Sequence, residues 1–411
     1  MSRLTGFWKR HVTPIVTTAV RGYLGRGSPT PQLATTARQH AAVMGCEWID
    51  LGQAPRLGLP PHGVTGDLAS VDRVGALLAN PIARETYDRL LRGSVVQRTA
   101  DRFVAVLENG RVTHDAGVVI ASGGEVLEDV SGIGFSSDVP TNPLRLSHLP
   151  RQRGTPHTVA VLTNGTCHNF FHWMMEAVPR LDLYERSGVT FDRVYAPIRH
   201  RFQRDSLALL GIPRNRILPA TRPAHVAAAR LMASSVHGSP SRWKTDFLFD
   251  RLTSGLPPFA GTGSRIYIAR RHRRSRAVVN ETEILAELEP LGFERCVLES
   301  MPLADQIAVF HRAEWVVGPH GAGLTNLAFC RPGTHVVEIG TPYRPWACFY
   351  EIAHHRGLDY HLHMASPVNI RHFDPQTGVG DSDLWVEPRG LHGVVAGLLE
   401  EGMQPRRRMA A

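Results

Sequence analysis

Short apolar runs alternate with longer amphipathic segments from residue 158 to residue 356. Apolar runs bounded by polar turns predict strands, whereas apolar positions three and four residues apart predict helices. The first half of this pattern predicts strands at 158–163, 193–196, 216–218 and 230–233, with helices at 170–187 and 202–210. The second half predicts strands at 266–268, 295–298, 315–317 and 334–339, with helices at 281–289, 303–313 and 349–356. Because such alternation favours parallel sheets, we expect two doubly wound α/β halves, joined near residues 255–264.

The remaining segments carry weaker signals. The N-terminal hundred residues are mixed, with a helix-like segment near 74–91, and the pattern at 103–130 indicates a small antiparallel sheet. A Pro- and Arg-rich stretch at 140–156 predicts a linker. We therefore divide the chain into an N-terminal region of unclear role (1–100), a small antiparallel β region (101–150), two Rossmann-like domains (151–260 and 261–390), and a C-terminal helix with a basic tail (391–411).

Composition is that of a globular protein with anionic partners. The chain has 411 residues, of which 43% are hydrophobic and 20% charged, and this suits two or three domains. A formal net charge of +9, largely from arginine, favours a nucleotide, phosphate, nucleic acid or acidic lipid as partner. The five cysteines are scattered, so neither a disulfide framework nor a zinc ribbon is indicated, and a reducing cytoplasm fits.

The N-terminus lacks the features of a membrane span. Its apolar run at 12–20 is interrupted by Pro14 and three threonines, and it is too short and too polar to cross a bilayer. The sequence Phe7-Trp8-Lys9-Arg10 is compatible with contact at a membrane surface, although a frayed terminus explains it as well.

A Gly-rich turn, Gly318-Pro-His-Gly-Ala-Gly-Leu-Thr-Asn326, follows a predicted strand and begins a predicted helix. The first amides of a helix have no intrahelical partner and carry partial positive charge, so this position favours an anion. Gly321 and Gly323 would allow a phosphate to approach the backbone closely. A purely structural turn remains the alternative.

A basic run lies about fifty residues earlier in the chain. Five arginines occur between Arg270 and Arg276, directly after a predicted strand, and arginine forks suit phosphate oxygens. A solvated loop or a nucleic-acid patch would explain the run alone. Because Arg270 and Gly318 both follow predicted parallel strands, where doubly wound sheets bind ligands, we expect them to form one site.

The first of the two α/β halves contains a separate group of polar residues. On a continuous helix, His168, His172 and Glu176 would be spaced four residues apart and would share a face. This face suits either a zinc site or a general base, His172, that is oriented by Glu176. The alternative is a core histidine packed beside Phe171 and Trp173.

Several common templates are absent. The chain contains no phosphate-binding G-x-x-x-x-G-K-[ST] loop and no G-x-S-x-G nucleophile elbow, and its glycine turn departs from G-x-G-x-x-G. Asp381-Ser-Asp383 resembles a metal-binding D-x-D, but it lies beyond the second alternation in a Gly/Asp-rich segment. We give it no catalytic role.

Taken together, the ordered blocks of the sequence resemble glycosyltransferase family 61, which includes bacterial capsular-polysaccharide enzymes, plant arabinoxylan transferases and animal O-linked N-acetylglucosamine transferases. The resemblance covers about residues 100 to 365. One block resembles H-W-x-x-E-x-x-P-R-L and another Y-I-S-R…R…N-E, with Ala269 where serine is usual. The residues that carry the resemblance are His172, Trp173, Glu176, Pro179, Arg180, Leu181, Tyr267, Arg270, Arg276, Asn280, Glu281, Gly292, Phe293, Gln306, the turn 318–326 and Glu338.

The resemblance implies a GT-B fold, in which two Rossmann-like domains face a cleft, and an inverting, metal-independent transfer from a nucleotide-sugar donor, with UDP-sugars favoured. It implies a glycan or glycolipid acceptor, a role in bacterial surface or capsular polysaccharide synthesis, and a cytoplasmic protein with peripheral contact at the inner membrane. The catalytic residues would be His172 as base and Glu176 as its orienter. The donor would contact Arg270, Arg276, His320, Gly321, Ala322, Gly323, Asn326 and Glu338, with Glu338 accepting hydrogen bonds from the ribose.

Two other functions compete with this hypothesis. A non-catalytic nucleotide-sugar scaffold would keep the glycine turn but would not need the base. A nucleic-acid-binding protein would explain the arginine run, but that run lacks interleaved aromatic residues, so we expect no nucleic acid partner.

Overall fold

The computed structural model describes residues 34–403, apart from residues 45, 54–56, 61, 82–83, 86, 89–95, 98–100, 132–148, 236–238, 271–275 and 345. The predicted membrane-contact segment 7–10, the start of the predicted linker, most of the basic run and the basic tail lie outside the described residues. Contacts divide the chain into two compact units, one made of residues up to 54 with 100–238, the other of residues 55–99 with 239–411. Within the described ranges, none of the helices combines the length and apolarity needed to cross a bilayer.

The first unit is built on one large mixed sheet. Four of its strands run parallel and lie side by side in the order β13 (His225–Ser234), β10 (Arg153–Val161), β11 (Arg193–Ala196) and β12 (Ile217–Pro219). The apolar periodicity predicted these strands, and their parallel arrangement is confirmed. Strand β10 lies at the centre of the four, so the segment after its carboxyl end is a preferred place for a site.

Antiparallel strands extend this sheet beyond β13. Strand β6 (Asp101–Glu108) pairs with the carboxyl-terminal half of β13 and with β2 (Glu47–Gln53). Strand β7 (Arg111–Thr113) pairs with the start of β13, and β8 (Val118–Ile120) and β9 (Val126–Leu127) follow it, all antiparallel. Strand β1 (Ala34–Thr35) pairs parallel with β9. The antiparallel strands predicted at 103–130 therefore belong to the same sheet as the parallel ones. The reason is the register, which sets Leu231 of β13 opposite Leu107 and Ala233 opposite Ala105 within one buried cluster.

The helix predicted at 170–187 is divided into three pieces. These are α6 (Phe170–His172), the π-helical turn η3 (Trp173–Ala177) and α7 (Arg180–Arg186). Pro179 has no backbone N–H to donate, which favours a break in front of α7. Trp173 is buried and donates from its indole nitrogen to Ser206 Oγ on α8 (Arg201–Leu209) at 2.8 Å.

The second unit is built on a fully parallel sheet. Its strand order is β15 (Phe293–Val297), β14 (Ser264–Ala269), β16 (Ala313–Pro319), β17 (His335–Gly340), β18 (Asp359–Met364) and β4 (Gly63–Gly66). In chain order the first five strands read 2-1-3-4-5, so the winding reverses between β14 and β16. Ligands of doubly wound sheets bind at that switch point, beyond the carboxyl ends of the strands.

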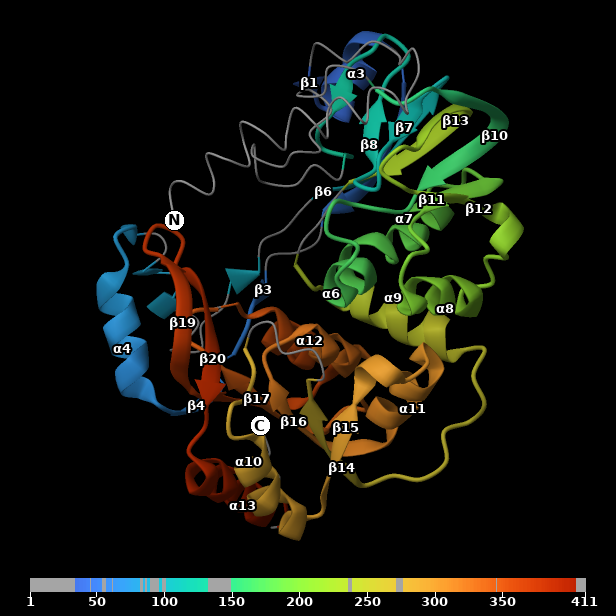
Figure 1. The fold of residues 1–411 in the computed structure, drawn as a ribbon. Coiled ribbons are helices and arrows are strands. Elements are labelled where there is room, and N and C mark those ends of the chain that lie inside the picture. Colours follow the sequence, from blue (N-terminus) through green and yellow to red (C-terminus); the bar gives the residue numbers. More distant parts are fainter. Residues whose placement is uncertain are drawn as a thin grey trace, which may run out of the picture. The chain divides into compact units, whose positions relative to one another are not determined.

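Helices cover both faces of this sheet (Figure 1). Helices α10 (Glu281–Leu288) and α13 (Pro388–Met403) cover the face that presents Tyr267, Val317 and Val337. The other side holds α9 (Arg242–Thr253), α11 (Leu303–Arg312), the 3₁₀ helix η7 (Ala322–Phe329) and α12 (Cys348–Arg356), which pack on one another. Because side chains alternate along β17, Glu338 points to this second side, between Val337 and Ile339 that point to the first.

Short elements complete the two units. Strand β4 comes from the N-terminal region, whose role was unclear from the sequence, and it adds an edge strand to the second sheet. The helix expected near 74–91 overlaps a helix that begins at residue 68, where Asp67 accepts a bond from the Ser70 amide, and the described residues 81, 84–85 and 87–88 are also helical. The other described elements are α3 (Ala37–Met44), β3 (Leu57–Gly58), α4 (Leu68–Leu77), β5 (Val96–Gln97), η4 (Arg214–Arg216), η5 (Glu289–Leu291), η6 (Leu298–Ser300), β19 (Ser366–Asp374) and β20 (Val379–Trp385).

Candidate functional site

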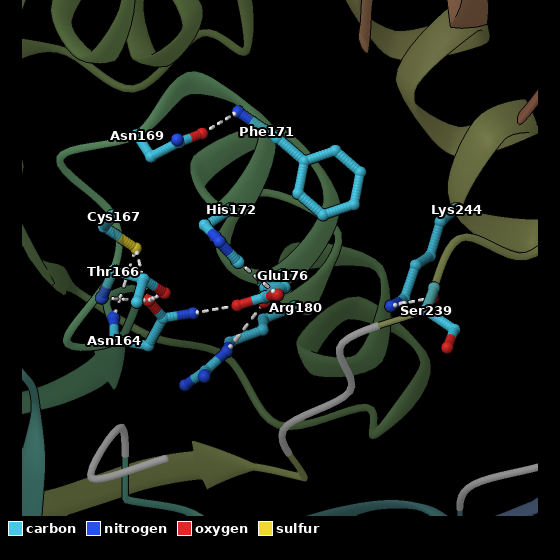
Figure 2. A network of polar contacts seen from close by, with 10 residues as sticks. All are labelled: Asn164, Thr166, Cys167, Asn169, Phe171, His172, Glu176, Arg180, Ser239 and Lys244. Atoms are coloured by element: carbon cyan, nitrogen blue, oxygen red, sulfur yellow. Dashed lines mark hydrogen bonds and ion pairs between the residues drawn. The ribbon is translucent and has the colours of Figure 1, made fainter. Parts of the chain in front are cut away.

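A histidine and a glutamate form a hydrogen-bonded pair in the first unit. His172 Nδ1 lies 2.6 Å from Glu176 Oε1, with the two residues on either side of the start of the π-helical turn (Figure 2). The His172 side chain is 34% exposed, whereas that of Glu176 is only 10% exposed. The ring is therefore held from one side by a largely buried carboxylate and remains reachable by solvent.

Asn164 fixes the other end of the Glu176 carboxylate. Its Nδ2 donates to Glu176 Oε2 at 2.7 Å, and its own Oδ1 accepts from the backbone amide and the hydroxyl of Thr166 at 2.9 and 2.8 Å (Figure 2). Asn164 belongs to none of the motifs noted in the sequence. Its position could have indicated a role in a site, because it is a polar residue three places after the carboxyl end of β10. Parallel sheets present their ligand-binding groups at that edge.

The π-helical turn positions the pair. The Val178 amide donates to the Trp173 carbonyl at 3.0 Å, which is the wider i to i+5 bond of a π-helix. Arg180 Nε donates to the Glu176 carbonyl at 3.0 Å and closes the same turn from the following helix. Single π-turns occur often at functional sites, since they place side chains that a regular helix would not.

His168 does not belong to this face, contrary to the expected spacing of four residues along one helix. It is exposed in the turn before α6, because Asn169 caps the helix by accepting from the Phe171 amide at 2.9 Å. A zinc site shared by His168 and His172 on one helix face is therefore wrong. No group of three or more histidine, cysteine or carboxylate side chains suited to a metal ion occurs in the part of the chain that the structure describes.

In the second unit, Arg270 lies against the glycine turn. Arg270 follows β14 and Gly318 ends the neighbouring strand β16, so both flank the switch point of the sheet. A Cβ atom added to Gly321 would lie 3.6 Å from Cζ and from Nε of Arg270. The structure thus brings together the two segments that the sequence placed at one edge of the sheet.

Two further arginines gather beside Arg270. Arg270 Nη1 donates to the Arg276 carbonyl at 3.4 Å. Burial, together with the positive charges of Arg270 and Arg344, lowers the pKa of Arg276 to about 10. Burial also lowers the pKa of Arg344, against the opposing effect of Asp381. Partly buried cations that repel one another favour an anionic ligand.

Arg344 was not identified from the sequence. It follows β17, and no recognisable motif surrounds it, but it falls at the same carboxyl edge of the sheet as Arg270.

His320 and Glu338 form a second histidine–glutamate pair, which is almost completely buried. His320 Nδ1 lies 2.5 Å from Glu338 Oε1, and the side chains are 5% and 2% exposed. Glu338 Oε2 accepts the Tyr360 hydroxyl at 2.7 Å. Both carboxylate oxygens are therefore used within the protein. Glu338 thereby holds the His320 ring in place, and the ribose contact expected of Glu338 stays a prediction.

The glycines of the turn serve two different purposes. A Cβ on Gly318 would lie 2.8 Å from Ile268 Cβ, and one on Gly323 would lie 2.9 Å from Leu298 Cδ1. These two positions allow close packing inside the protein, which corrects the expectation that Gly323 leaves room for a phosphate. Gly321, by contrast, faces Arg270 with ordinary contact distances and is the glycine that leaves room at the site.

The remaining predicted donor residues lie in η7. Ala322 is its first residue and is partly exposed, so its amide is among those without an intrahelical partner. Asn326 is completely buried, and its Nδ2 donates to Gln306 Oε1 at 3.0 Å and to the Gly323 carbonyl at 3.1 Å. Asn326 therefore holds the helix in place and does not face a ligand.

The D-x-D sequence lies on β20 and is used within the protein. Asp383 accepts from the Ala277 amide at 3.1 Å and from Arg371 Nη2 at 2.5 Å, and Asn369 Nδ2 also donates to it at 3.2 Å. Asp381 lies 3.4 Å from the same Arg371. These bonds attach the β19–β20 hairpin to the segment that carries Arg276, whose amide donates to the Ser382 carbonyl.

Comparison with known proteins identifies the segment that holds most of these residues. Residues 170–337 match the family model described as Glycosyltransferase 61. That range contains His172, Glu176, Arg270, Arg276 and His320, and it ends one residue before Glu338.

Curated relatives share shorter stretches with this chain. It is 31% identical over 119 residues to an EGF domain-specific O-linked N-acetylglucosamine transferase of Drosophila melanogaster, a match that covers 28% of this chain and 22% of the relative. It is 30% identical over 103 residues to a Beta-1,2-xylosyltransferase of Arabidopsis thaliana, covering 22% and 19%. The xylan glycosyltransferase MUCI21 of the same plant is 29% identical over 99 residues, covering 23% and 20%. The chain thus spans about a fifth of the length of the curated relatives it matches.

Proposed function

We propose that this chain, whose residues 170–337 form a domain of glycosyltransferase family 61, transfers a sugar from a nucleotide-sugar donor to a hydroxyl of a glycan or glycolipid. The observation that carries the proposal is the placement of Arg270 over the glycine turn at the switch point of the second sheet, beside Arg276 and Arg344. A diphosphate is the ligand that this combination of arginine forks, open glycine backbone and helix-start amides suits best.

The second unit would hold the donor and stabilise the leaving group. As the bond between the anomeric carbon and the diphosphate breaks, negative charge develops on the diphosphate oxygens. Arg270, Arg276, His320 and the amides around Ala322 would offset that charge without a metal ion. Such preorganised donors are worth more at a partly buried site than in water.

The first unit would supply the base for the acceptor. Because Glu176 is bonded to Nδ1 of His172, the Nε2 atom is the one that can take the acceptor proton. The acceptor oxygen would then attack the anomeric carbon on the face opposite the leaving diphosphate, which inverts the configuration in a single displacement. The two units would then correspond to the two domains of a GT-B enzyme.

The cellular setting is part of the same proposal. A net charge of +9 suits a cytoplasmic enzyme that meets an acidic membrane surface and a lipid-linked acceptor. The family resemblance adds bacterial surface or capsular polysaccharide as the product, and the relatives described above come from a fly and a plant. UDP-sugars are the donors that we would test first.

Nucleotide binding tests the donor site directly. UDP should bind the protein in calorimetry, and Arg270→Ala should weaken binding by roughly 1.5 to 3 kcal/mol, the usual loss for charge-assisted hydrogen bonds. Gly321→Val should also weaken it, because the added side chain would fill the space beneath Arg270. Arg389→Ala, an exposed arginine near the start of α13, is the matched control. If both site variants fold and bind UDP like the parent, the donor site is misplaced.

Metal dependence is a separate prediction. We expect transfer to continue in EDTA, because arginines are offered to the diphosphate and Asp383 is bonded to three protein groups. Initial rates with and without chelator, followed by manganese addition, provide the measurement. Loss of activity in EDTA with recovery in manganese would contradict the prediction and would direct attention to Asp381.

A further inference from the structure

Trp346 lies exposed next to Arg344, which with Arg270 and Arg276 forms what we call the arginine cluster. Among the described residues, Trp346 and Trp385 are the two exposed tryptophans, with 47% and 38% of their surface accessible. Trp346 belongs to the segment after β17, and its amide donates to the Arg344 carbonyl at 2.8 Å. A large apolar ring that remains in water is costly, so an exposed tryptophan beside a ligand site suggests that a ligand covers it.

The neighbours of the indole connect it to both parts of the donor site. The guanidinium carbon of Arg344 lies 4.8 Å from the Trp346 ring centroid, and the ring of His320 lies 6.2 Å away. His320 in turn rests against Phe349, with ring centroids 4.9 Å apart. Trp346 therefore lies between the arginine cluster and the buried His320–Glu338 pair.

The chemistry of this surface favours a planar, aromatic ligand group. A guanidinium lies over the indole and an imidazole lies 6.2 Å from it, and the nearby carboxylate of Glu338 is already bonded to His320 and Tyr360. A nucleobase needs only a π-face to stack on. Stacking of a base on an aromatic side chain contributes about 1–3 kcal/mol and tolerates any base.

We propose that Trp346 is the stacking platform for the nucleobase of the donor, which would use the ring face opposite the Arg344 guanidinium. This inference rests on the proposed function, because it takes the anion at the arginine cluster to be a nucleoside diphosphate. It adds a part of the site that lies outside the matched segment 170–337.

Binding of two probes distinguishes the base from the phosphates. UDP carries both groups, whereas inorganic pyrophosphate carries only the phosphates. Calorimetry should show that Trp346→Ala weakens UDP binding by about 5- to 100-fold, the factor that corresponds to one stacked base, and leaves pyrophosphate binding unchanged. Trp346→Phe should recover most of the loss, and Trp385→Ala, the other exposed tryptophan of the same unit, should bind both probes like the parent.

Other results would contradict the role of Trp346, the nucleobase site or the proposed function, and they can be told apart. Equal UDP affinity in the parent and in Trp346→Ala would remove the platform and leave the donor site intact. Equal loss of UDP and pyrophosphate would show that Trp346 acts only through the arginines. If the parent binds pyrophosphate but none of UDP, GDP, ADP and dTDP, the base site is wrong. If it binds neither pyrophosphate nor any of these nucleotides, the proposed function fails as well.

Discussion

Replacing His172 with alanine should lower kcat by about 10²- to 10⁴-fold, the range that a general base contributes, while UDP affinity stays close to that of the parent. The reason is that, in the proposed function, the base and the donor site have separate tasks. His172 belongs to the first unit, and its Nδ1 is bonded to Glu176, so as the proposed base it would act on the acceptor hydroxyl and not on the nucleotide. Steady-state kinetics and calorimetry on the same preparation would measure both quantities.

His168→Ala is the matched control for this experiment. The two histidines are four residues apart, but His168 is exposed in the preceding turn and has no part in the Glu176 pair. Its removal should leave kcat unchanged. A core-packing role for His172 predicts a lower melting temperature and joint loss of binding and turnover, which its 34% exposure argues against. A stable His172→Ala variant with full activity would transfer the assignment to Glu176.

Asn164 provides a graded version of the same test. Asn164→Ala keeps the base and its carboxylate but removes the bond that fixes Glu176 Oε2. We expect a smaller loss of kcat than in His172→Ala, because the carboxylate remains but is less well oriented.

Elements with strong apolar periodicity were predictable from the sequence. Strand β11 (Arg193–Ala196) lies where the pattern placed it, and α10 (Glu281–Leu288) differs by one residue. Local patterns suffice there, because burial of one face determines the conformation. The mixed α/β class follows from the same patterns.

The start of α6 at residue 170 was predicted from the sequence, but the face shared by His168, His172 and Glu176 assumed a helix that began earlier. Asn169 is a strong helix N-cap residue, and its side chain accepts from the Phe171 amide. A helix that begins after Asn169 excludes His168 from the face of His172. The π-helical turn that follows could not be predicted from the sequence, because nothing in the local pattern distinguishes it from an α-helix.

Other features depend on contacts between residues far apart in the chain. Strand β4 is four residues long and begins and ends with glycine, and it pairs with β18 nearly 300 residues later. The role of Gly323 depends on Leu298, and the role of Glu338 depends on Tyr360. Motif spacing identified these residues, but only the tertiary contacts show which neighbouring side chains they pack against or bond.

The second large effect is expected for the buried pair His320 and Glu338 in the second unit. His320→Gln should lower kcat by about 10²- to 10³-fold, the loss typical of one preorganised donor to a developing negative charge, and should weaken UDP binding. Glutamine is chosen because it can still donate to Glu338, whereas alanine would leave a buried carboxylate with Tyr360 as its one remaining partner.

Glu338→Gln tests whether charge or geometry matters in this pair. The amide can keep the contact with His320 Nδ1 but removes the negative charge beside the ring. We expect UDP affinity and kcat to fall together, because both would depend on how the carboxylate orients and polarises the ring that donates to the diphosphate. Tyr360→Phe removes one hydrogen bond to the same carboxylate without changing its charge, so its effect should be clearly smaller. Thermal melting would show whether each variant is folded. If Glu338→Gln keeps full activity, or if Tyr360→Phe is equally damaging, the pair is a packing feature and the leaving-group role belongs to the arginines alone.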